Sequence, residues 1–548
     1  MQRLASIIFV IICFISWPSV SKLQNIQTDV PTGQTVKHAG YLRIPFQDAV
    51  STVDPGLTVD EHSIEVVEQL FVGLTDFCPK TYQVMPELAT DWEANEEGTV
   101  YTFHLRKDAK WSDDSPITAQ DIVWTIQRHL APEFNAPMVN NLHVLKGTES
   151  TKQKKNNQTL GVKALDNYTV EFTLETAIGY FPALASLPIY RPLPRKVIEE
   201  YGDQWTEPKH IQTSGSYQLS EWSHGDKLVL TKNPFYYATD KVHINKVVYH
   251  IISDSILALN MYEKGALDII GGRYLPLPQM DMPRITTDFV LRREIQTSPV
   301  FMTEFFGFNT HNPPLDNRLV RKAIAAAIDK KVLNDFVIWG VNTPATTFTR
   351  PPIFGSIDPK QETVGIPFNP KQAQIWLTEA GYPEGKDFPK LRLLYSTSED
   401  FQNIALAVKK MLKHHLNIDV EIENRDWPTD YLNEIEQKTT HLFRMAWTAD
   451  YPDANNWLYD VFHPEKGFFH WVWDNSEFAT IVEKAKHLPD PTERKQLYRR
   501  AEQILTQEDT AIIPIYFAVN RLLVKPWVKG WYNMAFGGQH IRDWRLEN

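Results

Sequence analysis

Between residues 390 and 447 the sequence alternates between two patterns of apolar residues, and this alternation constrains the fold more than any other feature. Runs with strand character cover residues 390–395 and 419–422, and a longer segment with helical periodicity, 400–415, separates them. A further strand-like run follows at 442–447. Strands that alternate with helices of these lengths form α/β units around a parallel or mixed sheet. We therefore expect an α/β fold.

Similar patterns recur along most of the 548 residues, a length that suggests two to four domains. Ser63 is predicted to cap one helix, and Thr118 with Asp121 forms a predicted capping box at another. Helices are expected over 63–74, 118–130, 257–264, 313–329, 370–380 and 491–507. Strands are expected over 41–46, 100–106, 227–232, 246–252, 301–308 and 512–524, and a hairpin over 162–174.

The stretch 441–458 carries the first candidate for a binding site. Its first half resembles a strand with Arg444 as a lone charge, and its second half, from Asp450, is rich in turn formers. On an extended strand Arg444 and Asp450 would share one face about 20 Å apart. A separated cation and anion suit a short zwitterion with an ammonium at one end and a carboxylate at the other. The alternative is that each charge has a structural partner, which is common for such residues.

The N-terminus has the features of a secretory signal peptide. Arg3 precedes an apolar run over 4–17, and the small-residue pattern Ser19-Val20-Ser21 predicts cleavage after residue 21. The mature chain then keeps a single cysteine, Cys78, so no internal disulfide is expected. No other stretch is long and apolar enough to predict a transmembrane helix. We expect an exported protein, most simply in a bacterial periplasm.

Composition and motifs argue against several function classes. The net charge of -11 disfavours nucleic-acid binding, which needs clustered Lys and Arg. The nucleophile elbow, the H-E-x-x-H zinc motif, the P-loop and the G-x-G-x-x-G loop are all absent, and no Cys/His cluster has metal-ligand spacing. We expect no enzyme, no metal and no cofactor. Hydrolysis by two carboxylates stays open, because Asp and Glu are abundant.

Five segments carry a resemblance to a known family: 85–122, 213–217, 233–236, 314–329 and 512–527. In order and spacing they resemble the periplasmic oligopeptide- and dipeptide-binding proteins of ABC importers, over nearly the whole mature chain. The resemblance implies a three-domain, two-lobed periplasmic binding protein of type II, with a hinge that closes over the ligand. Lobe I would comprise 40–71, 197–300 and 515–548, a smaller domain 72–196 would be inserted, and lobe II would span 301–514.

The resemblance also implies roles for particular residues. Asp450 would receive the α-ammonium group of a peptide, and Arg444 would meet peptide carboxylates. The peptide backbone would pair with two segments of the chain, one in each lobe. These segments are Val59 to Glu61, and Ala446 with Trp447 and Thr448.

The sequence departs from the family at the carboxylate end of the expected site. Phe401 lies in a segment where relatives often have a His, and 336–339 lacks a Lys that relatives offer. Fewer cations would therefore meet a carboxylate, which suggests a narrower ligand such as a tripeptide or a cell-wall peptide. Trp447, Trp427 and Tyr451 are candidates for the walls of side-chain pockets.

The function that these observations predict is capture of short peptides and their delivery to a membrane ABC permease, by a monomer that binds no nucleic acid. Three alternatives stay open. One is a receptor of the same fold for another ligand, such as a murein peptide, a nickel chelate, haem or a sugar. The others are a secreted peptide hydrolase and a chaperone-like exported protein.

Overall fold

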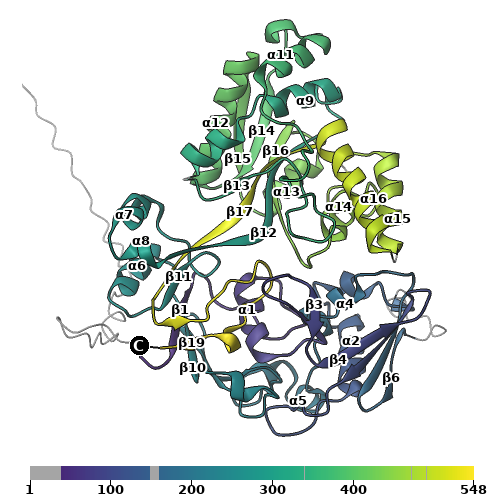
Figure 1. Cartoon of the computed structure of the whole chain (residues 1–548), viewed down its shortest axis with the longest axis vertical. Helices are drawn as coiled ribbons and strands as arrows, with labels where there is room; N and C mark the ends of the chain where they lie inside the picture. The colour runs from purple at the N-terminus through teal and green to yellow at the C-terminus, as the bar shows by residue number, and fades with distance from the viewer. Residues whose placement is uncertain (1–38, 149–159, 339, 471, 489, 548) are drawn as a thin grey trace, which may run out of the picture.

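The computed structural model describes residues 39–148, 160–338, 340–470, 472–488 and 490–547. The predicted signal peptide lies outside these ranges. Figure 1 shows two bodies, one above the other, joined by the long strands β12 (Ile295–Phe308) and β17 (Ile512–Val524). Within the described part of the chain, no helix has the length and apolar character needed to cross a membrane.

The lower body in Figure 1 contains two four-stranded sheets. The first has the order β1-β10-β9-β8, with β1 parallel to β10 and the other pairs antiparallel. The second, β4-β5-β7-β6, is antiparallel and includes the predicted hairpin, β6–β7. The strands are β1 Leu42–Phe46, β4 Ala89–Ala94, β5 Val100–Leu105, β6 Val162–Asp166, β7 Thr169–Thr173, β8 Tyr217–Ser223, β9 Lys227–Lys232 and β10 Lys246–Ile251.

A seven-stranded mixed sheet extends from the connecting strands into the upper body. Its order is β11-β17-β12-β16-β14-β15, and β13 pairs with β17. Strand β14 is parallel to β15 and β16, whereas β12 is antiparallel to β16 and β17. The expected α/β fold is thus confirmed. The remaining strands are β2 Thr75–Phe77, β3 Val84–Pro86, β11 Ile269–Gly271, β13 Thr343–Pro344, β14 Leu391–Ser396, β15 Val420–Arg425, β16 Leu442–Thr448, β18 Val528–Lys529 and β19 Arg545–Leu546.

Helices cover the sheets of both bodies (Figure 1). The α-helices are α1 Glu61–Leu70, α2 Ala119–Leu130, α4 Phe181–Leu184, α5 Arg195–Tyr201, α6 Ser255–Glu263, α7 Met282–Thr287, α8 Leu291–Glu294, α9 Arg318–Ala326, α10 Lys330–Val332, α11 Pro370–Glu379, α12 Glu399–Leu416, α13 Thr429–Glu436, α14 Asn455–Phe462, α15 Ser476–His487 and α16 Pro491–Gln503. Short 3-10 turns lie at Val139–Leu142, Pro188–Tyr190, Gly202–Thr206, Thr239–Lys241, Gln279–Asp281, Pro383–Gly385 and Ile541–Asp543, and π turns at Leu333–Val337 and Ile504–Glu508.

The helix starts test the predicted caps. The predicted cap Ser63 is wrong, because the carboxylate of Asp60 caps α1 by accepting the Ser63 backbone N–H at 2.8 Å. The capping box of α2 is confirmed, since Asp121 accepts the backbone N–H of Thr118 at 2.8 Å. A side-chain oxygen that accepts such an orphan N–H typically contributes about 1 kcal/mol to helix stability.

The contact between β12 and β16 leaves no room for a side chain at Gly307. A Cβ added there would lie 2.2 Å from the ring of Phe443 on β16. The two strands pair from Met302 with Thr448 to Phe308 with Leu442. This close approach fixes the position of β16 on the connecting strand β12.

The connecting strands bear on the predicted domain boundaries. The boundary at 300/301 falls inside β12, and that at 514/515 falls inside β17. Both strands run without a break from one body to the other (Figure 1). The division into two lobes and an inserted domain stays a prediction.

Candidate functional site

One edge of β16 is open along most of its length. Strand β14 pairs with Leu442 and Phe443 alone, and no other described strand covers this side. The Ala449 N–H donates to Phe301 of β12 at 2.8 Å. Because backbone groups alternate in direction along a strand, Ala446 and Thr448 point their N–H and C=O groups away from β12. An extended chain could add to this edge.

Arg444 marks one end of the open edge, and it has a structural partner. Its guanidinium forms an ion pair with the carboxylate of Glu304 on β12, and the two side chains are 12% and 1% exposed. Burial raises the pKa of Glu304, although the charge of Arg444 opposes the shift. The ring of Phe401 covers the guanidinium, with its centre 3.2 Å from the central carbon. A ligand carboxylate would therefore meet an Arg444 whose charge is already offset.

Asp450 lies at the other end, beyond the last residue of β16. The extended spacing assumed between Arg444 and Asp450 ends at Thr448, where the strand ends. The Asp450 carboxylate accepts a hydrogen bond from Asn456 Nδ2 at 3.0 Å. Burial raises the pKa of Asp450, against the effect of this hydrogen bond. No Lys, Arg or His among the described residues forms an ion pair with Asp450.

A buried polar network lies behind Asp450. Asp460 accepts hydrogen bonds from Tyr451 Oη at 2.8 Å and from Asn455 Nδ2 and Asn456 Nδ2, each at 3.2 Å. Burial raises the pKa of Asp460 to about 6. Of this network, Tyr451 was predicted from the sequence, whereas Asn455, Asn456 and Asp460 were not. Their signal in the sequence is a high density of amides and acids after Pro452.

The predicted pocket walls differ in exposure. Tyr451 is buried, and its ring stacks on Tyr180 of the lower body, with 5.4 Å between centres and 8° between planes. Trp447 is partly buried and donates from Nε1 to Asn456 Oδ1 at 3.4 Å. Trp427 is 55% exposed, which excludes a role as core. Tyr451 and Trp447 therefore lie close to the Asp450 network.

The second predicted pairing segment, in the lower body, is only partly extended. Val59 precedes α1 and is 58% exposed. Glu61 is the first residue of α1, so its expected place in an extended pairing segment is wrong. The change follows from the Asp60 cap, which starts the helix two residues before the predicted position. The exposed Val59 remains a predicted pairing residue.

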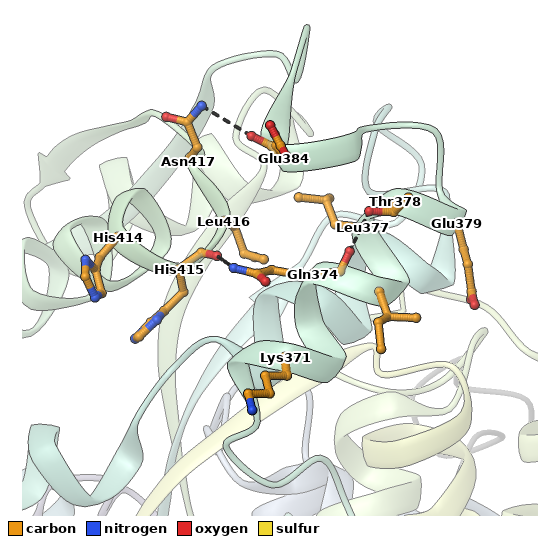
Figure 2. A pocket seen from close by; sticks show the side chains of 12 residues that line it. Lys371, Gln374, Leu377, Thr378, Glu379, Glu384, His414, His415, Leu416 and Asn417 are labelled. Atoms are coloured by element: carbon orange, nitrogen blue, oxygen red, sulfur yellow. Dashed lines mark hydrogen bonds between the residues drawn. The ribbon is translucent and has the colours of Figure 1, made fainter.

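A cavity of about 780 Å³ lies well away from this edge, between α11 and the end of α12. Figure 2 shows its lining, which includes His414, His415 and Lys371. Two amides of the lining, both exposed, already donate to backbone carbonyls: Gln374 to His415 at 3.0 Å and Asn417 to Glu384 at 3.3 Å. None of the predicted site residues lines it.

One group in the described chain has the spacing of metal ligands: Glu68, Asp76 and His540. Two arginines already neutralise it. Arg191 pairs with Glu68 at 2.6 Å, and Arg542 pairs with Asp76. These contacts make the group a structural ion cluster that ties the C-terminal segment to the lower body.

Comparison with known proteins places this geometry in a family. The model of the bacterial extracellular solute-binding proteins, family 5, matches residues 83–469. The periplasmic oligopeptide-binding protein OppA of Escherichia coli is 32% identical over 516 residues, which cover 92% of each chain.

Solved structures agree with that match. The unliganded open form of MppA, a periplasmic murein tripeptide-binding protein, superimposes with a TM-score of 0.80 at 28% identity, over 94% of this chain and 99% of that one. The oligopeptide-binding protein OppAIV of Borrelia burgdorferi gives a TM-score of 0.74 at 30% identity, over 92% and 99%. The family match, the sequence identity and the shared fold together lead to one conclusion: this chain belongs to the bacterial extracellular solute-binding proteins of family 5.

Proposed function

We propose that this protein captures short peptides, which add as a strand to the open edge of β16 and place their free amino end at Asp450. One observation carries the proposal: a half-buried carboxylate, which no cation of the described residues pairs with, lies at the end of a strand edge that no described strand covers. A peptide supplies both missing parts, since its backbone pairs with the edge and its ammonium neutralises the acid. Backbone pairing gives affinity without a strong dependence on peptide sequence.

The peptide would be handed to a membrane ABC permease, and the protein would act as a monomer in the periplasm without changing its cargo chemically. The E. coli and B. burgdorferi relatives bear the name of oligopeptide-binding proteins, which supports this role. Closure of the two bodies over the peptide would exclude water and strengthen the charge-assisted bond to Asp450.

A cell-wall peptide is the second candidate, and the state of Arg444 favours it. The Glu304 carboxylate already offsets the arginine, and Phe401 covers it. A ligand whose end opposite the ammonium group binds without a strong cation would suit this arrangement. A solved relative of the same fold bears the name of a murein tripeptide-binding protein, which supports this candidate.

Two measurements test the proposal. Native mass spectrometry of the purified protein should detect intact peptides that are released on denaturation. Calorimetry with trialanine and N-acetyl-trialanine should show that acetylation weakens binding strongly, because a buried, uncompensated carboxylate is costly.

The matched variants are Asp450→Asn and Asp430→Asn, the latter an exposed residue of α13. Asp450→Asn should weaken trialanine binding by more than tenfold, since removal of one partner of a buried charged contact costs about 2–5 kcal/mol. Asp430→Asn should leave binding unchanged. Cleavage of the peptide, or equal affinities of wild type and Asp450→Asn, would refute the proposal.

A further inference from the structure

Asn456 makes more contacts to the proposed ammonium site than any residue expected from the sequence. Its Nδ2 donates to Asp450 Oδ2 at 3.0 Å and to Asp460 Oδ2 at 3.2 Å. Its Oδ1 accepts the backbone N–H of Asp450 at 2.9 Å and the indole N–H of Trp447 at 3.4 Å. One amide therefore holds the backbone and the side chain of Asp450 together.

The position of Asn456 is itself fixed. It is the second residue of α14, is 1% exposed, and donates its own backbone N–H to the Asp453 carbonyl at 3.0 Å. Arg494 of α16 anchors the same turn through its ion pair with Asp453 at 2.8 Å. The Asn456 amide thus projects from a helix start that these contacts hold in place.

We propose that Asn456 is a positioning residue for the ammonium site: it holds the Asp450 carboxylate in place and keeps it ionised, and so sets the selectivity for free amino ends. This inference rests on the proposed function. An amide suits the task because it can donate to a carboxylate and accept from a backbone N–H at the same time. An aspartate in its place could accept but not donate.

The surrounding charges define what Asn456 does to Asp450. Asp460, which shares the same amide, is a like charge, and Lys486 of α15 attracts Asp460. Tyr451 bonds to Asp460 and stacks on Tyr180. The Asn456 hydrogen bond lowers the pKa of Asp450, whereas burial raises it. Loss of that bond should let Asp450 take up a proton at a higher pH.

The test is the pH profile of trialanine binding, measured by calorimetry for wild type, Asn456→Asp and Asn456→Ala. Peptide affinity should fall on the acid side as Asp450 protonates. Both variants should bind trialanine at least tenfold more weakly at neutral pH, and the acid midpoint of binding should move to higher pH. Asn456→Asp keeps the shape and the acceptor oxygen but removes the donor and adds a like charge beside Asp450, and both changes raise the pKa of Asp450. Comparison with Asn456→Ala separates the lost bond from the added charge. Asn456→Ala adds no charge and serves if the aspartate variant does not fold.

Asn309→Ala is the matched control, because Asn309 is also 1% exposed but lies after β12, where its backbone N–H donates to His441. It should leave the midpoint unchanged. A midpoint that stays in place in both Asn456 variants, or that moves equally in Asn309→Ala, would overturn the positioning role while wild-type discrimination against N-acetyl-trialanine still supports the proposed function. A wild type that binds both peptides equally would remove the proposed function and this inference with it.

Discussion

Substitution of Arg444 by methionine should destabilise the fold more than substitution of an exposed charged residue would. Glu304 is 1% exposed, and its ion pair with Arg444 is the contact that neutralises it. Removal of one partner of a buried pair leaves an uncompensated charge, which typically costs 3–5 kcal/mol. The carboxyl group can escape this cost by taking up a proton.

The free energy needed to protonate Glu304 sets the size of the stability loss and its pH dependence. An ordinary Glu has a pKa of about 4.3, so protonation costs about 1.4 kcal/mol for each pH unit above that value. The loss at pH 7 is therefore at most about 3–4 kcal/mol, and at pH 5 at most about 1 kcal/mol, because the raised pKa of Glu304 already costs the wild type part of this energy. The sign follows from linkage: in Arg444→Met the folded state holds a proton that the unfolded state has released, so stability falls as pH rises from about 4 to 7.

Thermal and urea unfolding of Arg444→Met at pH 5 and pH 7 would measure this difference. A loss of about 3 kcal/mol lowers Tm by roughly 6–12 °C for a domain of 150–250 residues. Glu304→Gln in the same chain should restore most of the loss at pH 7, because no buried charge remains. A loss that is equal at the two pH values, or that Glu304→Gln does not rescue, would refute the account of the pair.

Three further changes test other parts of the structure. Gly307→Ala should destabilise the protein by about 1–3 kcal/mol in urea unfolding, because the added Cβ would lie 2.2 Å from Phe443, and Phe443→Leu should reduce the loss. Lys330→Met should remove a rise in stability between pH 7 and about 10: burial lowers the pKa of Lys330 to about 7, so the unfolded chain binds the extra proton in this range. Asp60→Ala should cost about 1 kcal/mol through the lost cap of α1, as measured by thermal unfolding.

The regular elements were predictable because their patterns are local. The strand, helix and strand between residues 390 and 425 appear as β14, α12 and β15, close to the expected positions. Helix α14 was missed because it follows the turn formers Pro452 and Asp453 and is buried on nearly all sides, which removes the contrast between a polar and an apolar face.

The site was predictable only in part. The pattern around residue 450 indicated an acid at a strand end, and the structure places Asp450 there. The partner of Arg444 could not be found in the same way, because Glu304 lies 140 residues earlier in the chain and meets it only across paired strands. Asn456 carries no charge and no motif, so its role emerges only from its four contacts.

The Asp450 carboxylate also gives a reason for the protein to stay open without ligand. Closure over an empty site would bury this charge further with no cation to compensate it, whereas a peptide ammonium supplies that cation. A ligand shifts the equilibrium between the open and closed forms only by the difference in its affinity for the two forms. The contact between the peptide ammonium and Asp450 would supply this difference, and would so link peptide binding to closure. Asp450→Asn should therefore make the ligand-free protein more compact on average, by small-angle X-ray scattering, than the wild type. A ligand-free radius of gyration that is equal in the two proteins, while wild type contracts with trialanine, would show that the charge of Asp450 does not hold the empty protein open.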